Sequence, residues 1–591
     1  PAAFDADSAC MAFTNITVTA YATPNGTFIP TNGIDPHVYM LGLVLKFSDL
    51  VGGSWFRDMN VTGILSAGEK AHFGVMFQWL YGLDLFPILV VDANRDGVYD
   101  TAYVDMSFDW SWIPLLYYVL TGEMWPYWAA PWPPEFSFAD EVPLIPKGFP
   151  LAARDFTHDG VYDLSAGVLG YLLDVWAVAP NVYDRGLVLK PIDPRGNYTC
   201  FVNDWIGHGT SCASCAAGRD VGHPLTGAGV APGSKVMGVV ALWIYDLIEA
   251  QLWAAGFDLI PGTEDWTFVP GYGLAYGTWN YTGRHKADII SNSWGWPTWA
   301  PALQGLPWYD VLSMLEDALT IPGYLDPDYP GTVIVHAGGN GAPGYGTFTP
   351  PGYASLPIGV GASTSMSWTS LAFGFAGGYC DDVIPWSARG PTPLGYVKPD
   401  LVNIGARGFT ATTVWAGLGD GAQAIENFGG TSMATPLTAG TASLIAQAYN
   451  QARGAKPTPE LTKVLLKSTA KDLGYDAFVQ GAGRVDAFSA VRLAVGESGV
   501  EIASSATWSN VRSRIELAWS IYSGYLHQAP LPSSPPGPVS DTGWFAGFVR
   551  PGGAATAEFT VRNPTSSGVG VAITPVTYKP IVPVLRYEGY T

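Results

Sequence analysis

The spacing of apolar and polar positions changes twice along the chain. Residues 1–199 contain short apolar runs interrupted by Gly, Pro and Asn, which predicts strands joined by long loops. Residues 200–496 alternate short β-branched runs with helical patterns, and this predicts a mainly parallel sheet covered by helices. Residues 497–591 favour strands again, but they are too few to complete a β-sandwich of about 100 residues. We therefore expect an α/β core flanked by two β-rich parts.

One helix can be bounded from the sequence alone, in "TPELTKVLLKSTAKDLG". Thr458 can cap its first turn, Pro459 suits that turn, and Gly474 can end the helix. Further along, "AATAEFTVRN" and "SSGVGVAITPV" predict two strands around a turn.

A stretch rich in Trp, Tyr and Pro covers residues 110–138. We expect it to pack on the outside of the core, and a lid or a partner surface is the alternative.

Composition narrows the class of protein. The chain has 48% hydrophobic and 13% charged residues and a formal net charge of −21. A charge this negative argues against nucleic acid or an anionic membrane as partner. No apolar run reaches the roughly 18 residues of a membrane span, so no transmembrane segment is expected. Residues 1–30 carry no signal peptide pattern, and the low total charge fits an extracellular life in acidic surroundings.

Cysteines and glycosylation sequons give a similar picture. Cys212 and Cys215 form a C-x-x-C, but no second pair completes a zinc site, and no thioredoxin-like context supports a redox role. One disulfide plus buried thiols among Cys10, Cys200, Cys212, Cys215 and Cys380 is the favoured interpretation. Five N-x-S/T sequons fit a secreted, glycosylated surface. They begin at Asn15, Asn25, Asn60, Asn197 and Asn280.

Two motifs carry candidate chemistry. In "NFGGTSMATPLTAG", Ser432 follows two glycines and a threonine at the start of a helical run. The positive potential of a helix N-terminus favours the negative charge that develops in acyl transfer, although such a serine can also be a plain N-cap. In "DWIGHGTSCASCAAG", His208 lies between glycines at the start of another helix.

Taken together, G-T-S-M-A-T-P and H-G-T, with His before Ser, resemble the subtilisin-like serine proteases (subtilases) over residues 200–495. The resemblance implies a three-layer α/β fold in which His208 is the general base and Ser432 the nucleophile. By the same resemblance, Asn340 in "VIVHAGGNGAPG" donates to the oxyanion, and "KPDLVNIGA" is a further landmark. The strand in "ISNSWG" implies that substrate backbone pairs with Ser293, Trp294 and Gly295.

Asp92 ends an apolar strand, "FPILVV", where a catalytic aspartate could stand. However, "VDANRDGVYDTA" is repeated 63 residues later as "RDFTHDGVYDLS", and both copies cannot hold the same catalyst. Each copy matches the first part of a calcium loop, without the Glu at position 12. Structural calcium is therefore expected, and metal-free Asp-Gly turns are the alternative. The ligands would be Asp92, Asn94, Asp96, Val98 and Asp100 in one loop, and Asp155, Thr157, Asp159, Val161 and Asp163 in the other.

The triad aspartate has no obvious place in the sequence. Subtilases carry it in D-[ST]-G after a strand, and no such motif precedes His208. The repeat resembles the long insert of large archaeal and tripeptidyl-peptidase-like subtilases, in which the aspartate comes first. We therefore expect it upstream of Pro1, in an N-terminal fragment that would be a partner of this chain. Asp5, Asp35 and Asp92 are the weaker candidates.

The resemblance implies an extracellular endopeptidase that acts on protein or peptide substrates. Two alternatives stay open. The missing aspartate favours an inactive subtilase that serves as a cell-surface structural or binding protein, with a surface layer as its partner. A tripeptidyl-type exopeptidase would need one end of its cleft blocked, which residues 110–138 could do.

Overall fold

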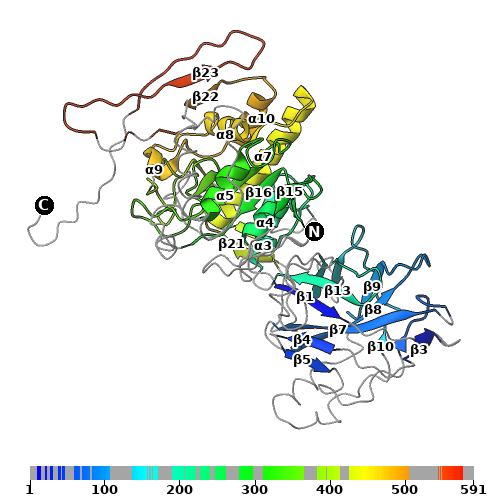
Figure 1. Ribbon diagram of the computed structural model, residues 1–591. Helices are drawn as coiled ribbons and strands as arrows, with labels where there is room; N and C mark the ends of the chain where they lie inside the picture. The colour runs from blue at the N-terminus through cyan, green and yellow to red at the C-terminus, as the bar shows by residue number, and fades with distance from the viewer. Residues whose placement is uncertain are drawn as a thin grey trace, which may run out of the picture. The chain divides into compact units, whose positions relative to one another are not determined.

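A computed structural model of the chain divides into two compact units, which are described separately (Figure 1). The first unit holds residues 1–210, 238–246 and 411–426, and the second holds residues 211–237, 247–410 and 427–591. The structure describes residues 9–14, 20–22, 27–30, 37–40, 43–46, 59–66, 69–79, 83–106, 136–155, 158, 162, 164–170, 190–204, 207–220, 227–239, 247–260, 278–296, 311–364, 382–393, 396–406, 408–412, 425–504, 543–544, 546 and 549–576. The aromatic stretch 110–138 therefore lies almost wholly outside the described residues.

The described part of the first unit is built mainly from antiparallel strands, with one parallel pair, β6 (Met59–Asn60) with β10 (Phe136–Ser137). β7 (Ala71–Trp79), β8 (Leu83–Val91) and β9 (Thr101–Val104) form one sheet in that order. Alternate residues of β8 point to one core, where Ile88 and Val90 meet Phe201. The other strands are β1 (Ala9–Thr14), β13 (Tyr198–Asn203), β12 (Leu164–Leu169) and β11 (Leu151–Arg154) in a second sheet, β10 (Phe136–Ser137), β6 (Met59–Asn60), β3 (Thr27–Pro30) and β2 (Ala20–Ala22) in a third, and the pair β4 (His37–Met40) and β5 (Leu43–Lys46).

The second unit contains the parallel sheet that the sequence predicts. Its strand order is β16 (Ile289–Asn292), β17 (Val333–Ala337), β18 (Ile358–Ser363) and β19 (Leu401–Ile404). Every residue of β17 and β18 is buried, as expected for strands covered on both faces. β14 (Phe257–Leu259) pairs with β15 (Trp279–Tyr281), and the short strands β20 (Gly408–Ala411) and β21 (Ile425–Phe428) complete this list.

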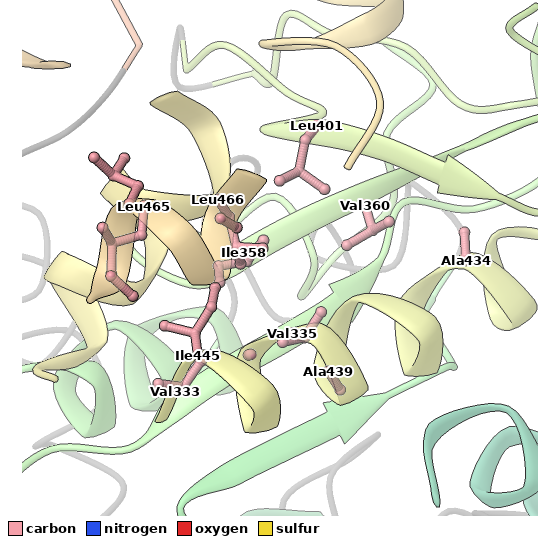
Figure 2. Close-up of a cluster of buried hydrophobic side chains, with 14 residues drawn as sticks. Val333, Val335, Ile358, Val360, Leu401, Ala434, Ala439, Ile445, Leu465 and Leu466 are labelled. Atoms are coloured by element: carbon pink, nitrogen blue, oxygen red, sulfur yellow. The ribbon is translucent and has the colours of Figure 1, made fainter. Parts of the chain in front are cut away.

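Helices cover both faces of this sheet, giving three layers. Val333 and Val335 of β17 pack with α7 (Thr431–Arg453), α8 (Pro459–Ser468) and α10 (Ala487–Ala494) in one apolar cluster (Figure 2). Since successive strand residues point to opposite faces, His336 points the other way, where it meets α5 (Val311–Thr320). The remaining helices are α3 (His208–Ala217), α4 (Leu247–Ala254) and α9 (Ala477–Gln480). None of the helices in the described part of the chain is long and apolar enough to cross a membrane.

The helix predicted at 458–474 is shorter than expected. Thr458 caps it, its Oγ1 accepting a hydrogen bond from the Leu461 N–H at 3.1 Å, and Pro459 is its first residue. The helix ends at Ser468, however, because Lys471 leaves it to exchange backbone hydrogen bonds with Arg484. The tertiary pairing therefore overrides the helical pattern of the last turn.

The C-terminal region forms one antiparallel pair, β22 (Glu501–Ser504) with β23 (Phe559–Arg562). The first of the two predicted strands is confirmed, because β23 lies in "AATAEFTVRN". The second is wrong, since residues 568–576 have no strand structure and no sheet neighbour supplies hydrogen bonds to them.

Leu465→Ala tests the cluster of Figure 2. Leu465 is fully buried between α8 and the sheet, so the substitution should lower the free energy of unfolding by about 2–5 kcal/mol. Phe488→Ala is the control, because this side chain is 72% exposed on α10 and its loss should change stability by about 0.5 kcal/mol or less. Chemical denaturation measures both, and equal losses would contradict the assignment of the core.

Candidate active site

Ser432 is the second residue of α7, not its N-cap. The N-cap is Gly430, whose φ of 102° and ψ of 176° suit glycine, and no side chain caps the helix. The plain N-cap interpretation of Ser432 is therefore wrong. The serine lies inside the first turn, 9% exposed, where unpaired N–H groups and the helix dipole create positive potential.

Ser432 is joined to Ser293 by two hydrogen bonds. The Ser432 hydroxyl donates to the Ser293 carbonyl at 3.3 Å, and the Ser293 hydroxyl donates to the Ser432 carbonyl at 3.0 Å. The thiol of Cys212 lies 3.6 Å from the same Ser432 carbonyl. Two of the residues predicted for the site, far apart in sequence, are thus brought together, and Cys212 joins them.

Asn340 is held in one orientation at the start of α7. It follows the end of β17, and its Oδ1 accepts hydrogen bonds from the Thr431 N–H at 2.9 Å and from the Thr431 hydroxyl at 3.0 Å. A backbone N–H can only donate, so the amide oxygen must face Thr431 and the Nδ2 donor must face away.

The two expected oxyanion donors flank one point. A Cβ built on Gly430 would lie 3.3 Å from Asn340 Nδ2 and 3.5 Å from the Ser432 nitrogen. Asn340 Oδ1 also lies 3.5 Å from this point, so the point shows only that the two donors implied by the resemblance are near one another, beside a glycine.

The segment Ser293–Gly295 leaves β16 close to the loop before β18. A Cβ on Gly295 would come within 2.8 Å of the Thr349 hydroxyl, so only glycine fits without a shift. The Trp296 N–H donates to the Pro350 carbonyl at 2.8 Å, and the Trp294 ring packs against the His336 ring at 4.9 Å between centroids. The segment predicted to pair with substrate is thus fixed on several sides.

His208 is the first residue of α3, and Asp204 supports the turn before it. The buried Asp204 carboxylate accepts hydrogen bonds from the N–H groups of Gly207 at 2.9 Å and Thr210 at 2.8 Å, and from the Thr210 hydroxyl at 2.8 Å. It therefore satisfies the free N–H groups at the helix start and holds the turn that carries His208. Cys212 follows one turn later, on the same face of α3 as His208.

Asp92 closes its own loop. Its two carboxylate oxygens accept hydrogen bonds from the N–H groups of Asp96 at 3.1 Å and Gly97 at 2.8 Å. The Asp96 carboxylate accepts from the Val98 N–H at 2.8 Å, and Asp100 accepts from the Ala93 N–H at 3.2 Å. Gly97 has a φ of +89°, which makes the turn possible.

The described residues do not bring three or more acidic, His or Cys side chains together as a ready metal cage. The Asp92 loop still offers carboxylate and amide oxygens on one exposed turn, so calcium stays a prediction there. Of the second loop, only Asp155 and two neighbours are described. Thr157, Asp159, Val161 and Asp163 lie outside the described residues, as do Asp5, Asp35 and the side chain of Cys10.

Three cysteines can be assessed. Cys200 and Cys215 are buried, Cys212 is half-buried, and none of them is in a disulfide. Burial raises the pKa of the Cys215 thiol, which makes it a weak nucleophile. These positions agree with the expectation of buried thiols. Cys380 and the side chain of Cys10, the two remaining candidates for a bridge, lie outside the described residues.

A scan against protein-family models matches residues 187–484, half of the chain, to the subtilase family, Peptidase_S8. The chain belongs to the subtilase family. Among curated relatives of this subtilase, pyrolysin of Pyrococcus furiosus is 27% identical over 473 residues, covering 72% of this chain and 27% of pyrolysin. Serine protease AprX of Bacillus subtilis is 30% identical over 351 residues, covering 54% of this chain and 68% of AprX. The chain thus spans about a quarter of pyrolysin.

Among solved structures, the patellamide maturation protease PatA aligns with a TM-score of 0.33 at 21% identity, covering 49% of this subtilase and 85% of PatA. A protease of Pseudoalteromonas arctica aligns with a TM-score of 0.31 at 23% identity, covering 49% and 70%. The assignment of this chain as a serine peptidase with an α/β fold rests on the family match and on the parallel sheet.

Gly430→Ala should lower kcat and also cost stability, because alanine is strained at a φ of 102° and a ψ of 176°. The new methyl group would lie 3.3 Å from Asn340 Nδ2 and 3.5 Å from the Ser432 nitrogen, so kcat should fall by about 10²–10³-fold, as when an oxyanion donor is lost. Gly454→Ala is the matched control at the other end of α7. It shares a positive φ, but its Cβ meets nothing within 4 Å. Steady-state kinetics on both variants measure the effect. A wild-type kcat for Gly430→Ala would contradict the assignment of Asn340 Nδ2 and the Ser432 N–H as oxyanion donors.

Calcium should stabilise the Asp92 loop. A ligand at 100 times its dissociation constant adds about 2.7 kcal/mol, so thermal unfolding of the wild type should occur at higher temperature in calcium than in chelator. Asp92→Asn should reduce this difference. Asp326→Asn, which changes another half-buried turn aspartate that accepts a backbone N–H, should leave it intact. Identical wild-type curves in calcium and chelator would rule out the metal.

Proposed function

We propose that this subtilase is an extracellular serine endopeptidase with Ser432 as its nucleophile. The observation that carries the proposal is the convergence at the start of α7. The Ser432 hydroxyl, the Ser432 N–H and the Asn340 amide nitrogen gather there, beside the Ser293 carbonyl. Acyl transfer needs this set: an attacking hydroxyl, and donors aimed at the oxygen on which charge develops.

The proposed reaction proceeds in balanced steps. Ser432 Oγ attacks the peptide carbonyl while His208 accepts the hydroxyl proton, and the carbonyl oxygen becomes an oxyanion between Asn340 Nδ2 and the Ser432 N–H. His208 then gives the proton to the leaving amine as the acyl-enzyme forms. Water repeats the sequence, with His208 as its base, and releases the acid. An aspartate on the other His208 nitrogen would fix the tautomer, and its position remains a prediction.

Substrate would lie along Ser293–Gly295, the segment that follows β16. An extended peptide can pair with this backbone, as a strand adds to the edge of a sheet. In such pairing the enzyme binds main-chain groups of the substrate rather than one particular side chain, which suits cleavage within long chains. We therefore favour the endopeptidase, because main-chain pairing needs no free terminus. The stretch 110–138, on which the tripeptidyl-type exopeptidase would depend, lies almost wholly outside the described residues.

An extracellular location is supported by the sequons. Of the five, Asn280 lies exposed on β15 and Asn197 is half-exposed before β13, so both could accept a glycan. Glycosylation requires passage through a secretory route, and the low content of charged residues fits acidic surroundings.

Ser432→Ala should abolish peptide hydrolysis in the full-length protein, by roughly 10⁶-fold in kcat as in the subtilisin example on which this magnitude rests. A fluorophosphonate probe should label the wild type at Ser432 and leave the variant unlabelled. Ser443→Ala is the control, because this serine lies on the same helix and only bonds the Ala439 carbonyl. An unlabelled, inactive wild type would instead favour the surface protein built from an inactive subtilase.

A further inference from the structure

A buried carboxyl group lies behind the proposed substrate segment. Glu316 of α5 is fully buried, and its Oε1 accepts hydrogen bonds from Asn292 Nδ2 at 3.0 Å and from Gln251 Nε2 at 3.4 Å. His336 Nε2 lies 3.6 Å from the same oxygen. One oxygen therefore gathers side chains from α4, β16 and β17.

These contacts lead directly to the segment at Ser432. Asn292 and His336 are neighbours in register at the carboxyl ends of β16 and β17. Asn292 immediately precedes Ser293, the residue that exchanges two hydrogen bonds with Ser432. His336 packs edge-on against the ring of Trp294, the next residue along. Glu316 thus contacts the support of the segment at two consecutive positions.

The contact between Glu316 and His336 does not need an ion pair. Burial lowers the pKa of His336 to about 3, so the ring is neutral over the working range of most peptidases. What Glu316 supplies is then an acceptor oxygen for the amides of Asn292 and Gln251. The neutral His336 ring only packs beside that oxygen, because its Nδ1–H donates to the Ala337 carbonyl. A glutamine at 316 would keep that oxygen, whereas a leucine of similar size would leave the Asn292 amide without it.

A purely structural role is the competing explanation, and the same helix contains an example of one. Asp317 is also fully buried, but its carboxylate accepts a hydrogen bond from the Leu356 N–H at 2.7 Å, in the turn before β18. This hydrogen bond supports the turn before β18, whereas the one from Asn292 to Glu316 lies next to Ser293. Variants of Glu316 and Asp317 can therefore be compared to distinguish a role in positioning the site from a role in stabilising the fold.

We propose that Glu316 is a positioning residue for peptide hydrolysis: through Asn292 it fixes the segment Ser293–Gly295 against Ser432. The inference rests on the proposed function, because it takes Ser432 as nucleophile and this segment as the substrate strand. A displacement of about 1 Å in such a segment can cost about 10²-fold in rate, so a buried group that never touches substrate can control kcat.

The test compares Glu316→Leu, Glu316→Gln and Asp317→Leu in the full-length protein, with active sites counted by fluorophosphonate labelling. Per labelled site, Glu316→Leu should lose about 10²-fold in kcat/KM on an extended peptide. It should lose less on a one-residue ester, which does not use the segment. Glu316→Gln should recover most of the loss. Asp317→Leu should lower the melting temperature and leave kcat and KM per labelled site unchanged.

Asn292→Ala covers the case in which Glu316→Leu does not fold. It removes the donor rather than the acceptor, and it should show the same larger loss on the peptide than on the ester. Wild-type kinetics per labelled site in Glu316→Leu or in Asn292→Ala would overturn the proposal, and so would equal losses on peptide and ester. Failure of the proposed function has a different signature, namely labelling and hydrolysis that Ser432→Ala leaves intact.

Discussion

The double hydrogen bond from Thr431 to Asn340 Oδ1 is the constraint on which the site depends. It joins the end of β17 to the start of α7 through one side-chain oxygen. Because that oxygen is committed to Thr431, the amide nitrogen faces away from Thr431, and both it and the Ser432 nitrogen lie within 3.5 Å of the space beside Gly430. The donors are therefore in place before any substrate arrives. Preorganisation of this kind is the larger part of what oxyanion donors contribute.

A rigid frame is needed to keep this junction in place, and a charged cluster supplies part of it. Asp400, the residue immediately before β19, lies within 3.1 Å of the ammonium groups of Lys398, Lys463 and Lys467, whose side chains are all buried. Burial alone would raise the pKa of Asp400, but the three ammonium groups hold it well below its ordinary range. The carboxylate therefore stays charged and ties α8 to the sheet on the face shown in Figure 2. Removing one partner of such a cluster leaves a buried charge uncompensated.

The sequence predicts those features of the structure that depend on residues close together in the chain. The parallel sheet and the placement of Ser432 follow from patterns within a few residues, and the structure agrees with them. The support of His208 by Asp204 was also visible in principle, since an aspartate three residues before Gly207 is a common signal at a helix start. Thr431 and Glu316 could not be found this way, because their partners lie about 90 and 24 residues away and meet only in the folded chain. The early end of α8 could not be predicted for the same reason, because it results from the pairing of Lys471 with Arg484, and the helix propensity of nearby residues does not indicate that pairing.

The strand that ends in Asp92 shows why an aspartate in a suggestive place need not be a catalyst. A triad aspartate must offer an oxygen to the histidine ring, so its carboxylate has to be open on one side. Each oxygen of Asp92 accepts one N–H of its own loop, which a neighbouring glycine with positive φ makes possible, and each keeps a lone pair that calcium could use. Freeing one of them would leave a backbone N–H without its partner and open the turn. The repeat of the motif 63 residues later also favours a turn, since a chain can contain two copies of a turn but only one triad aspartate. Asp92 therefore serves the β8–β9 turn, and the position of the triad aspartate stays a prediction.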